Sequence, residues 1–445
     1  MIRLFRLSFL HGLAGLMLGV LDAGAAAAQP ATAAGRQPAA AAAAQPVPAA
    51  NGCLACHAAL SQPAWSAPAN LFRGGDVHQE RGFACVDCHG GDSATNDKAR
   101  AKDPARGFRG KPAGPQIVTV CARCHSDAEL MRRFAPRQRV DQATEYASSV
   151  HGKRLAAGDR QVATCISCHG AHGIRAVNDV RSPAFPTNVA STCGACHSNP
   201  EHMKGYTLAG GKPIPTNQRA EYERSVHYAA LTKRNDLSAP TCNDCHGNHG
   251  AAPPGVGAVA NVCGTCHAVF AAKFATSVHS QIFDRACVEC HSNHAVLPPS
   301  DEMLGTSAPA ICVTCHDSRD DAGYIVAGTM RSSIDRLKRA IETNGELIAR
   351  VQNAGMEVSG QELALGEART KLTQARMEMH AFSPAAVDPV VDDGMKILAG
   401  VEQAGARALA DLQFRRRGLF VSLGAILLVV VALFFKIREL DRRRQ

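Results

Sequence analysis

Cys53-Leu54-Ala55-Cys56-His57 is the first of nine Cys-x-x-Cys-His copies within residues 53–316. All 18 cysteines of the chain belong to these copies, and a histidine follows every pair. In this pattern the two thiols form thioethers with the vinyl groups of a haem, and the histidine binds one face of the iron. Zinc sites, redox pairs and disulfides also use Cys-x-x-Cys, but they do not require the fifth-position histidine. The sequence therefore predicts nine covalently bound c-type haems.

The predicted attachment residues are read directly from the nine copies. The thioether cysteines are Cys53, Cys56, Cys85, Cys88, Cys121, Cys124, Cys165, Cys168, Cys193, Cys196, Cys242, Cys245, Cys263, Cys266, Cys287, Cys290, Cys312 and Cys315. The predicted proximal iron ligands are His57, His89, His125, His169, His197, His246, His267, His291 and His316. No catalytic residue is predicted.

The spacing of the copies limits the fold of this region. Residues 53–316 offer roughly 29 residues for each haem, too few for a separate hydrophobic core around each one. Only 5% of the chain is aromatic. We expect mostly coil and short α-helices wrapped around nine stacked haems, over residues 51–320. Without haem this region could not offset the conformational entropy lost on folding.

The formal charge of +9 raises the question of nucleic-acid binding. The haem propionates are absent from that count and neutralise much of the excess. The arginines also concentrate around an apolar segment near the C-terminus. Because no basic patch is interleaved with aromatic residues, we predict no nucleic-acid partner.

The N-terminus has the features of a secretory signal. Arg3 and Arg6 precede an apolar run over residues 7–21, and four alanines end at Ala28. The alternative, a transmembrane anchor, fits less well because the run is short. We expect a signal peptide over residues 1–28 and an Ala/Pro-rich linker over residues 29–50. Export agrees with haem attachment, which takes place outside the bacterial cytoplasm.

A longer unit recurs within the motif region. It consists of Val-His, a Cys-x-x-Cys-His copy, usually Gly-x-His or Ser-x-His directly after it, and a second Cys-x-x-Cys-His copy. The unit is clear in residues 150–197, 226–267 and 278–316, and a degenerate first unit covers residues 77–125. In that first unit His89 is followed by Gly90-Gly91-Asp92, so the second histidine is missing. Such repetition predicts an elongated chain of stacked units.

The remaining histidines match the number of irons. Of 19 histidines, nine are proximal and His11 lies in the predicted signal peptide. A second histidine on most irons would give bis-histidine ligation, which favours electron transfer over catalysis. The nine predicted distal ligands are His78, His151, His172, His202, His227, His249, His279, His294 and His380.

Spacing limits which iron each distal histidine can reach. His172, His249 and His294 lie three residues after a proximal histidine, too close to reach the opposite face of the same haem, so we expect them to ligate a neighbouring haem. The Val-His histidines could ligate the haem of the following motif or an adjacent one. His202 and His380 lie outside the repeat and could fill the remaining positions. If either does not, that iron could take Met or Lys, or stay open.

The C-terminal third changes character. Apolar residues at helical spacing predict three long helices over residues 321–416, packed as an antiparallel, coiled-coil-like bundle or stalk. The second helix returns toward the last haem motif and brings His380 with it. Residues 418–435 are apolar except for Ser422. We predict a transmembrane helix over residues 417–437 and a basic cytoplasmic tail over residues 438–445.

The doubled Cys-x-x-Cys-His motifs, with Cys-x-x-Cys-His-Gly-x-His and Ser-Val-His, resemble the bacterial multihaem cytochromes c of the cytochrome c3-like group. The resemblance covers residues 53–316 and implies a periplasmic electron carrier with mostly bis-histidine haems. We therefore expect a protein of the inner membrane with a single C-terminal span and its haem domain in the periplasm. The expected partners are that membrane and redox proteins, a quinol-oxidising complex or periplasmic cytochromes.

Two alternatives stay open from the sequence. One is a quinol dehydrogenase resembling the NapC/NirT type, although those proteins carry fewer haems on an N-terminal anchor. The other is a multihaem reductase of nitrite, hydroxylamine or tetrathionate, which needs an open or unusual iron. No Cys-x-x-Cys-Lys motif is present. An electron-transfer protein is the expectation over an enzyme with its own substrate, and the oligomeric state stays open.

Overall fold

The computed structural model describes residues 51–254 and 259–444. The predicted signal peptide, residues 1–28, and the predicted linker, residues 29–50, lie outside these residues. The described chain is helical with long irregular connections and contains no β-strand; Thr207 and Pro213 form an isolated bridge. The expected mixture of coil and helix is thus confirmed.

The Cys-x-x-Cys-His copies tend to form single helical turns. The helices α3 (Cys85–His89), α9 (Cys165–His169) and α14 (Cys242–His246) each consist of one copy. A helical turn places residues three apart on one face, so both cysteines point the same way. The third residue of the copy caps this turn in each case, as where Asp244 Oδ2 accepts the Thr241 N–H at 2.7 Å.

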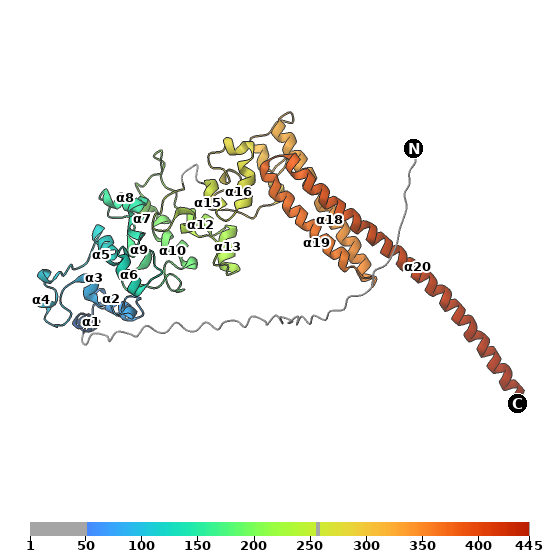
Figure 1. Ribbon diagram of the computed structural model, residues 1–445, viewed down its shortest axis with the longest axis horizontal. Coiled ribbons are helices and arrows are strands. Elements are labelled where there is room, and N and C mark those ends of the chain that lie inside the picture. The colour runs from blue at the N-terminus through green and yellow to red at the C-terminus, as the bar shows by residue number, and fades with distance from the viewer. Residues whose placement is uncertain (1–50, 255–258, 445) are drawn as a thin grey trace, which may run out of the picture. The chain divides into compact units, whose positions relative to one another are not determined.

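Short helices make up the rest of the region before residue 317 (Figure 1). The remaining α-helices there are α1 (Gly52–Ala58), α2 (Pro63–Arg73), α4 (Lys98–Ala101), α5 (Pro115–His125), α6 (Ala128–Phe134), α7 (Gln142–Ser148), α8 (Val150–Ala156), α10 (Pro186–His197), α11 (Pro200–Met203), α12 (Gln218–Tyr222), α13 (Val226–Lys233), α15 (Val259–Gly264), α16 (Ala268–Ala275) and α17 (Val288–His291). The 3₁₀ turns are η1 (Gln79–Arg81), η2 (Pro104–Arg106), η4 (Val278–Gln281), η5 (Asp301–Met303) and η6 (Ile311–Thr314).

Apolar packing is sparse in this part of the chain. Its one cluster of buried hydrophobic residues among the described residues consists of Ala230, Leu231 and Ala239. The cluster in the C-terminal helices has 17 buried members. So small a core cannot hold more than 200 residues against their conformational entropy. The sequence-based expectation that bound cofactors supply the missing core agrees with this distribution.

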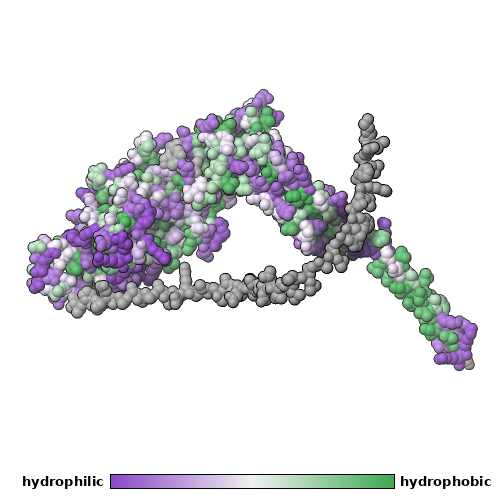
Figure 2. Space-filling model, viewed as in Figure 1, coloured by the Kyte–Doolittle hydropathy of each residue, from purple (hydrophilic) through white to green (hydrophobic). Residues whose placement is uncertain are grey.

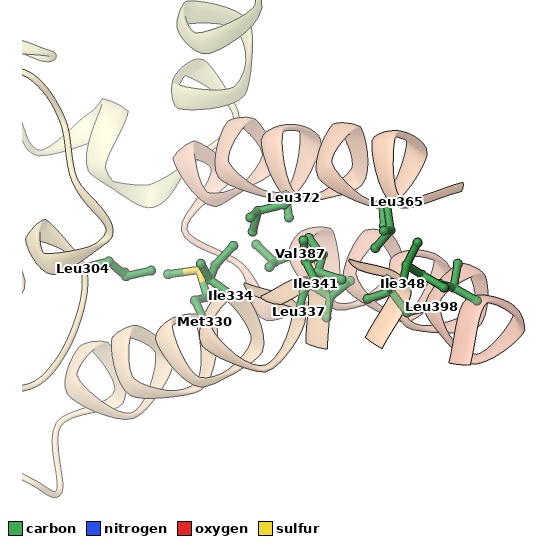
Figure 3. Packing of buried hydrophobic residues seen from close by; sticks show 14 of the residues in the cluster. Leu304, Met330, Ile334, Leu337, Ile341, Ile348, Leu365, Leu372, Val387 and Leu398 are labelled. Carbon is green, nitrogen blue, oxygen red and sulfur yellow. The ribbon is translucent and has the colours of Figure 1, made fainter. Parts of the chain in front are cut away.

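Three long helices form the C-terminal bundle. They are α18 (Ala322–Asn353), α19 (Ser359–Glu378) and α20 (Pro384–Arg444), with the turn η7 (Met379–Ala381) between the last two. Ile334, Leu337 and Ile348 of α18 pack against Leu365 and Leu372 of α19 and Val387 and Leu398 of α20 (Figure 3). The positions on which the sequence periodicity rests are therefore buried.

The last helix continues far beyond the bundle. Its residues as far as Gly405 pack against α18 and α19, and the apolar segment follows with no break in the helix. The sequence predicted a boundary between the bundle and the transmembrane helix at residues 416 and 417. The helix is continuous there, and Arg415–Leu419 contain no proline that would end it. The apolar segment is long enough to cross a membrane, and none of it is buried against protein. Figure 2 shows it as a continuous hydrophobic surface with a hydrophilic end.

Charged contacts attach the bundle to the preceding region. Arg376 of α19 donates from Nε and Nη2 to the two carboxylate oxygens of Asp301, at 2.8 and 2.6 Å. Lys273 of α16 pairs with Glu378 at 2.8 Å. Burial raises the pKa of Asp301, but Arg376 more than offsets it, so that the pKa is lowered. These contacts hold η7, which carries His380, against α16.

The bundle can be tested by truncating its most buried leucine. Leu337 is fully buried, and Leu337→Ala should reduce the free energy of unfolding of the bundle by about 2–5 kcal/mol. Leu363 is 68% exposed on the same bundle, and Leu363→Ala should change that energy by no more than about 0.5 kcal/mol. Urea unfolding followed by circular dichroism at the helix band measures both. Equal losses in the two variants would contradict the packing described.

Candidate haem sites

Eight pairs of histidine rings lie at nearly one separation. Their ring centroids are 6.0–6.3 Å apart, and each pair joins one motif histidine to one histidine outside the motifs. The pairs are His78–His125, His89–His172, His151–His197, His169–His249, His227–His267, His246–His294, His279–His316 and His291–His380.

This separation fits a metal between the rings. With metal–nitrogen bonds of about 2 Å on each side and about 1 Å from each ring centre to its nitrogen, two axial imidazoles need centroids about 6 Å apart. The motif cysteines beside each pair supply the covalent attachment. The residues present therefore fit a haem whose iron takes one histidine on each face.

The pairs follow one rule along the repeat. The Val-His histidine of a unit faces the second motif of the same unit, as His151 faces His197. The Gly-x-His or Ser-x-His histidine crosses to the first motif of the preceding unit, as His249 faces His169. After the last unit His380 of η7 takes the crossing role, opposite His291. The rule is consistent with the expectation that histidines of the second kind serve a neighbouring haem.

The two kinds of pair also differ in ring orientation. The crossing pairs, with His172, His249, His294 and His380, have interplanar angles of 10°, 21°, 12° and 16°. The pairs within a unit, with His78, His151, His227 and His279, have angles of 88°, 56°, 41° and 68°. Near-parallel and tilted ring pairs therefore alternate from motif to motif along the chain.

Backbone hydrogen bonds fix the crossing between units. In the first three units, the valine N–H of Val-His donates to the carbonyl two residues after the crossing histidine of the next unit. Val77 donates to Ile174 at 2.9 Å, and Val226 donates to Val296 at 2.8 Å. Val150 donates to Ala251 at 3.0 Å. Each junction thus positions a distal histidine from the following unit.

Many of the paired histidines use Nδ1 for a hydrogen bond to the protein. His89 Nδ1 lies 2.7 Å from the Gly110 carbonyl and His246 Nδ1 lies 3.2 Å from the Ala252 carbonyl. His316 Nδ1 lies 2.8 Å from Asp321 Oδ2. A hydrogen bond at Nδ1 orients the ring and leaves Nε2 as the nitrogen for a metal.

Burial favours the neutral ring that binds a metal. It lowers the pKa of ten of the paired histidines, because the charged imidazolium is poorly solvated there. These are His125, His151, His169, His172, His197, His227, His279, His291, His294 and His380.

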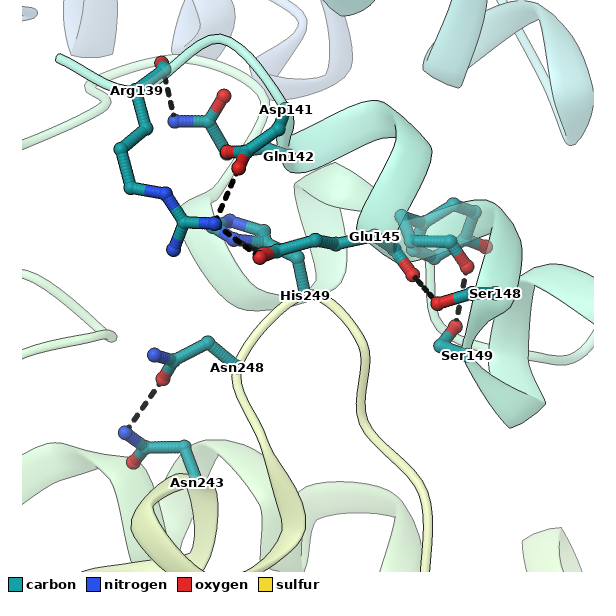
Figure 4. A network of polar contacts seen from close by, with 10 residues as sticks. Arg139, Asp141, Gln142, Glu145, Ser148, Ser149, Asn243, Asn248 and His249 are labelled. Carbon is teal, nitrogen blue, oxygen red and sulfur yellow. Dashed lines mark hydrogen bonds and ion pairs between the residues drawn. The ribbon is translucent and has the colours of Figure 1, made fainter.

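Carboxylates beside the distal histidines were not predicted from the sequence. Asp76 accepts from His78 Nδ1 at 3.1 Å and from the Ile174 N–H at 2.8 Å. Its burial raises its pKa, but these hydrogen bonds outweigh the burial and lower it. Glu145 lies 3.6 Å from His249 Nδ1, next to Arg139 and Asp141 (Figure 4).

The third repeat unit has an equivalent of Glu145. Glu221 lies 3.6 Å from His294 Nδ1. Glu145 and Glu221 each lie four residues before the serine of Ser-Val-His, and a tyrosine follows each of them directly. This recurrence was visible in the sequence, but only the structure shows that the carboxylate faces a histidine of the next unit.

Cysteines of consecutive motifs are neighbours throughout. Along the chain, a thiol of one motif raises the pKa of a thiol in an adjacent motif, together with burial. The neighbouring pairs are Cys53–Cys85, Cys88–Cys124, Cys121–Cys165, Cys168–Cys196, Cys193–Cys242, Cys245–Cys266, Cys263–Cys287 and Cys290–Cys312. Each motif from the second to the eighth thus uses one cysteine toward the motif before it and the other toward the motif after it.

Two predicted ligands are not brought into a histidine pair. The ring nearest to His57 is that of Trp65, at 6.3 Å, and His57 Nδ1 lies 3.2 Å from the Trp65 carbonyl. His202 stacks on Tyr206 with centroids 6.4 Å apart. Among the described residues, His202 therefore does not face a motif histidine.

Comparison with known proteins agrees with these sites. Residues 77–209 match the model of the cytochrome c3 family, and residues 279–321 match that of the doubled CXXCH motif. The chain is a multihaem c-type cytochrome. Its Cys-x-x-Cys-His motifs indicate covalently bound c-type haem. Searches of curated proteins and of solved structures gave no match.

The pairing of the cytochrome's His380 can be tested by substitution. His380→Ala should remove one axial ligand, so one additional haem per chain should become high-spin and bind CO when reduced. His202→Ala is the matched control, because His202 faces no motif histidine in the described chain, and it should leave the spectrum unchanged. Absorption and EPR spectra of the purified variants give the answer. A new high-spin haem in His202→Ala, and none in His380→Ala, would reverse the assignment.

The two ring orientations predict two groups of EPR signals. The mutual angle of axial imidazole planes sets the anisotropy of a low-spin ferric haem. The fully oxidised cytochrome should therefore show a rhombic group from the four near-parallel pairs and a more anisotropic group from the tilted pairs. Integration should give similar populations, with the His78–His125 pair, at 88°, contributing the most anisotropic signal. A single homogeneous group would be inconsistent with the alternating angles.

Proposed function

We propose that this chain is a membrane-anchored nonahaem cytochrome c that relays electrons between a membrane redox partner and a periplasmic or outer-membrane acceptor. The observation that carries the proposal is the series of eight histidine pairs, whose ring centroids lie 6.0–6.3 Å apart at every motif from Cys85 to Cys312. When bound, c-type haems accept and donate single electrons. The nine motifs hold nine such groups in the order of the sequence.

The residues of the chain perform two tasks in this function. Cysteines of adjacent motifs bring the attachment edges of successive haems together, first cysteine to first and second to second in alternation, over the first seven junctions. The paired histidines would bind eight irons, one imidazole on each face. Filled axial positions favour electron transfer over bond chemistry at those irons and tend to lower the potential relative to Met/His ligation.

Carboxylates near the paired histidines modulate these sites. Asp76, Glu145 and Asp321 each lie beside an axial imidazole, and negative charge there makes the imidazole a stronger donor. A stronger donor stabilises the oxidised iron. The chain therefore places lower-potential sites at its third, fourth and ninth motifs.

The apolar part of α20 supports the proposed location. Residues 417–437 cross the inner membrane, and the basic residues 438–445 remain in the cytoplasm. The signal peptide, residues 1–28, directs residues 51–320 to the periplasm, and the linker, residues 29–50, separates the two. The bundle, residues 321–416, joins the haem domain to the membrane. Quinol-oxidising complexes and periplasmic cytochromes are the proposed partners.

The relay and its haem number are tested together on the intact protein. Haem quantification and the mass of the purified chain should give nine haems. In membrane vesicles supplied with a quinol pool and a quinol-oxidising complex, the full chain should be reduced. A variant ending at Phe414 should be reduced by dithionite but much more slowly by the membranes, because it lacks the anchor. Fewer than nine haems, or equal reduction of both forms by the membranes, would contradict the proposal.

A further inference from the structure

The pairing rule predicts which residue should face the histidine of the first motif. In the first three units, the first motif is faced by a histidine that lies three residues after the next unit's first motif histidine, as His172 follows His169 and faces His89. The motif at Cys53 precedes the degenerate unit, so it stands in the same relation to that unit. The position that should supply its distal ligand is three residues after His89. Asp92 occupies it.

Asp92 is held by other partners. Its Oδ2 accepts from Arg100 Nε at 3.0 Å and lies 3.4 Å from Arg106 Nη1. Its Oδ1 accepts the Ala94 N–H at 2.9 Å. The backbone hydrogen bond and these two cations lower its pKa. The carboxylate is thus committed to the arginines of its own loop.

The loop after Asp92 nonetheless lies at the first motif. The Gly52 N–H donates to the Ser93 carbonyl at 2.9 Å, and a side chain at Gly52 would collide with the Thr95 carbonyl at 2.6 Å. Asn51 Nδ2 lies 3.9 Å from Cys85 Sγ, which joins the first motif to the second. The two motifs are therefore packed together as at other junctions, with a carboxylate where the repeat elsewhere places an imidazole.

The groups near His57 do not replace the missing imidazole. Its nearest ring is Trp65, whose indole nitrogen is a donor and has no lone pair for iron. Lys102 Nζ lies 5.9 Å from the centre of that indole. In the described chain, the one remaining unpaired candidate, His202, stacks on Tyr206 instead.

We propose that the haem attached through Cys53, Cys56 and His57 keeps an exchangeable sixth position that binds small anions, such as cyanide or nitrite. Lys102 brings positive charge near this motif and favours an anion over a cation, whereas Arg100 and Arg106 pair with Asp92. The inference rests on the proposed haem-carrying function and adds one ligand-binding iron to a series of closed ones. Because this motif is the first of the series, the site lies at one end of the electron path.

The test begins with the intact cytochrome in detergent. The oxidised protein should contain one high-spin haem per chain, and cyanide should convert it to low spin. The reduced protein should bind about one CO per chain, since a bis-histidine iron has no free position. Cys53→Ala/Cys56→Ala should carry eight haems and bind neither probe. An entirely low-spin oxidised protein that takes up no CO would overturn the proposal, as would ligand binding that persists in the double variant.

Substitution of Asp92 separates charge from ligation. Asp92→His restores the repeat and should abolish the high-spin signal and CO binding. Asp92→Asn loses the same ion pairs without supplying a ligand, so it should still bind CO. Retained CO binding in Asp92→His, with nine haems present, would contradict the assignment of this position. Lys102→Ala should leave the high-spin signal unchanged. A high-spin signal that appears in Lys102→Ala but not in the unmodified protein would show that Lys102 ligates the iron, and would overturn the exchangeable site.

The two proposals fail in distinguishable ways. Loss of the relay would appear as a haem count below nine or as haems that membranes do not reduce. Failure of the exchangeable site would leave nine haems and normal reduction, with every iron low-spin. The spectroscopic measurements therefore decide the second proposal independently of electron transfer.

Discussion

The pairing of imidazoles between repeat units is the constraint on which the rest of the haem region depends. A histidine in one unit faces the motif of the unit before it, as His172 faces His89, and both rings must lie about 6 Å apart to hold one iron. The His89–His172 pair joins segments that are 83 residues apart in the chain. It takes the place of the strand pairing or apolar packing that joins repeats in other elongated proteins.

This arrangement explains the sparse core of the region. Side chains bury few apolar residues there, whereas the C-terminal helices bury a continuous row from Leu304 to Val401. The polar residue before each Val-His is buried instead, Asp76 in the first unit and Ser149, Ser225 and Ser277 in the others. These residues fix the backbone next to each distal histidine. The proposed coordination would therefore serve both the stability of the haem region and its electron transfer.

The bundle completes the series at its C-terminal end. His291 has no further repeat unit to face it, and His380 of η7 supplies the ring. Phe382 packs on His279 with centroids 4.2 Å apart, so the same turn covers the distal ligand of the last motif. The salt bridge between Asp301 and Arg376 holds this turn in place. The long helix α20 then continues from the turn into the apolar segment.

Much of this arrangement could be predicted from the sequence, because the short Cys-x-x-Cys-His pattern is specific for haem attachment. The attachment cysteines, the periodic rows of the bundle and the need of His172 for a neighbouring haem all follow from spacing. The motif that His151 faces could not be predicted from spacing, because both motifs of its unit lie within reach of the chain. His202 was included because the number of histidines matched the number of irons, but a number does not say where a side chain lies. In the structure His202 stacks on Tyr206. The sequence shows Asp92 where the other units have a histidine. Only the junction geometry shows that a histidine at this position would face the first motif.

The most direct test of the account is an experimental density map of the oxidised holoprotein that resolves the axial ligands. The account predicts that the iron attached through Cys85 and Cys88 is bound by His89 and His172, and that the iron attached through Cys165 and Cys168 is bound by His169 and His249. Density joining His172 to the iron at Cys165 and Cys168, or to none, would contradict the pairing between repeat units.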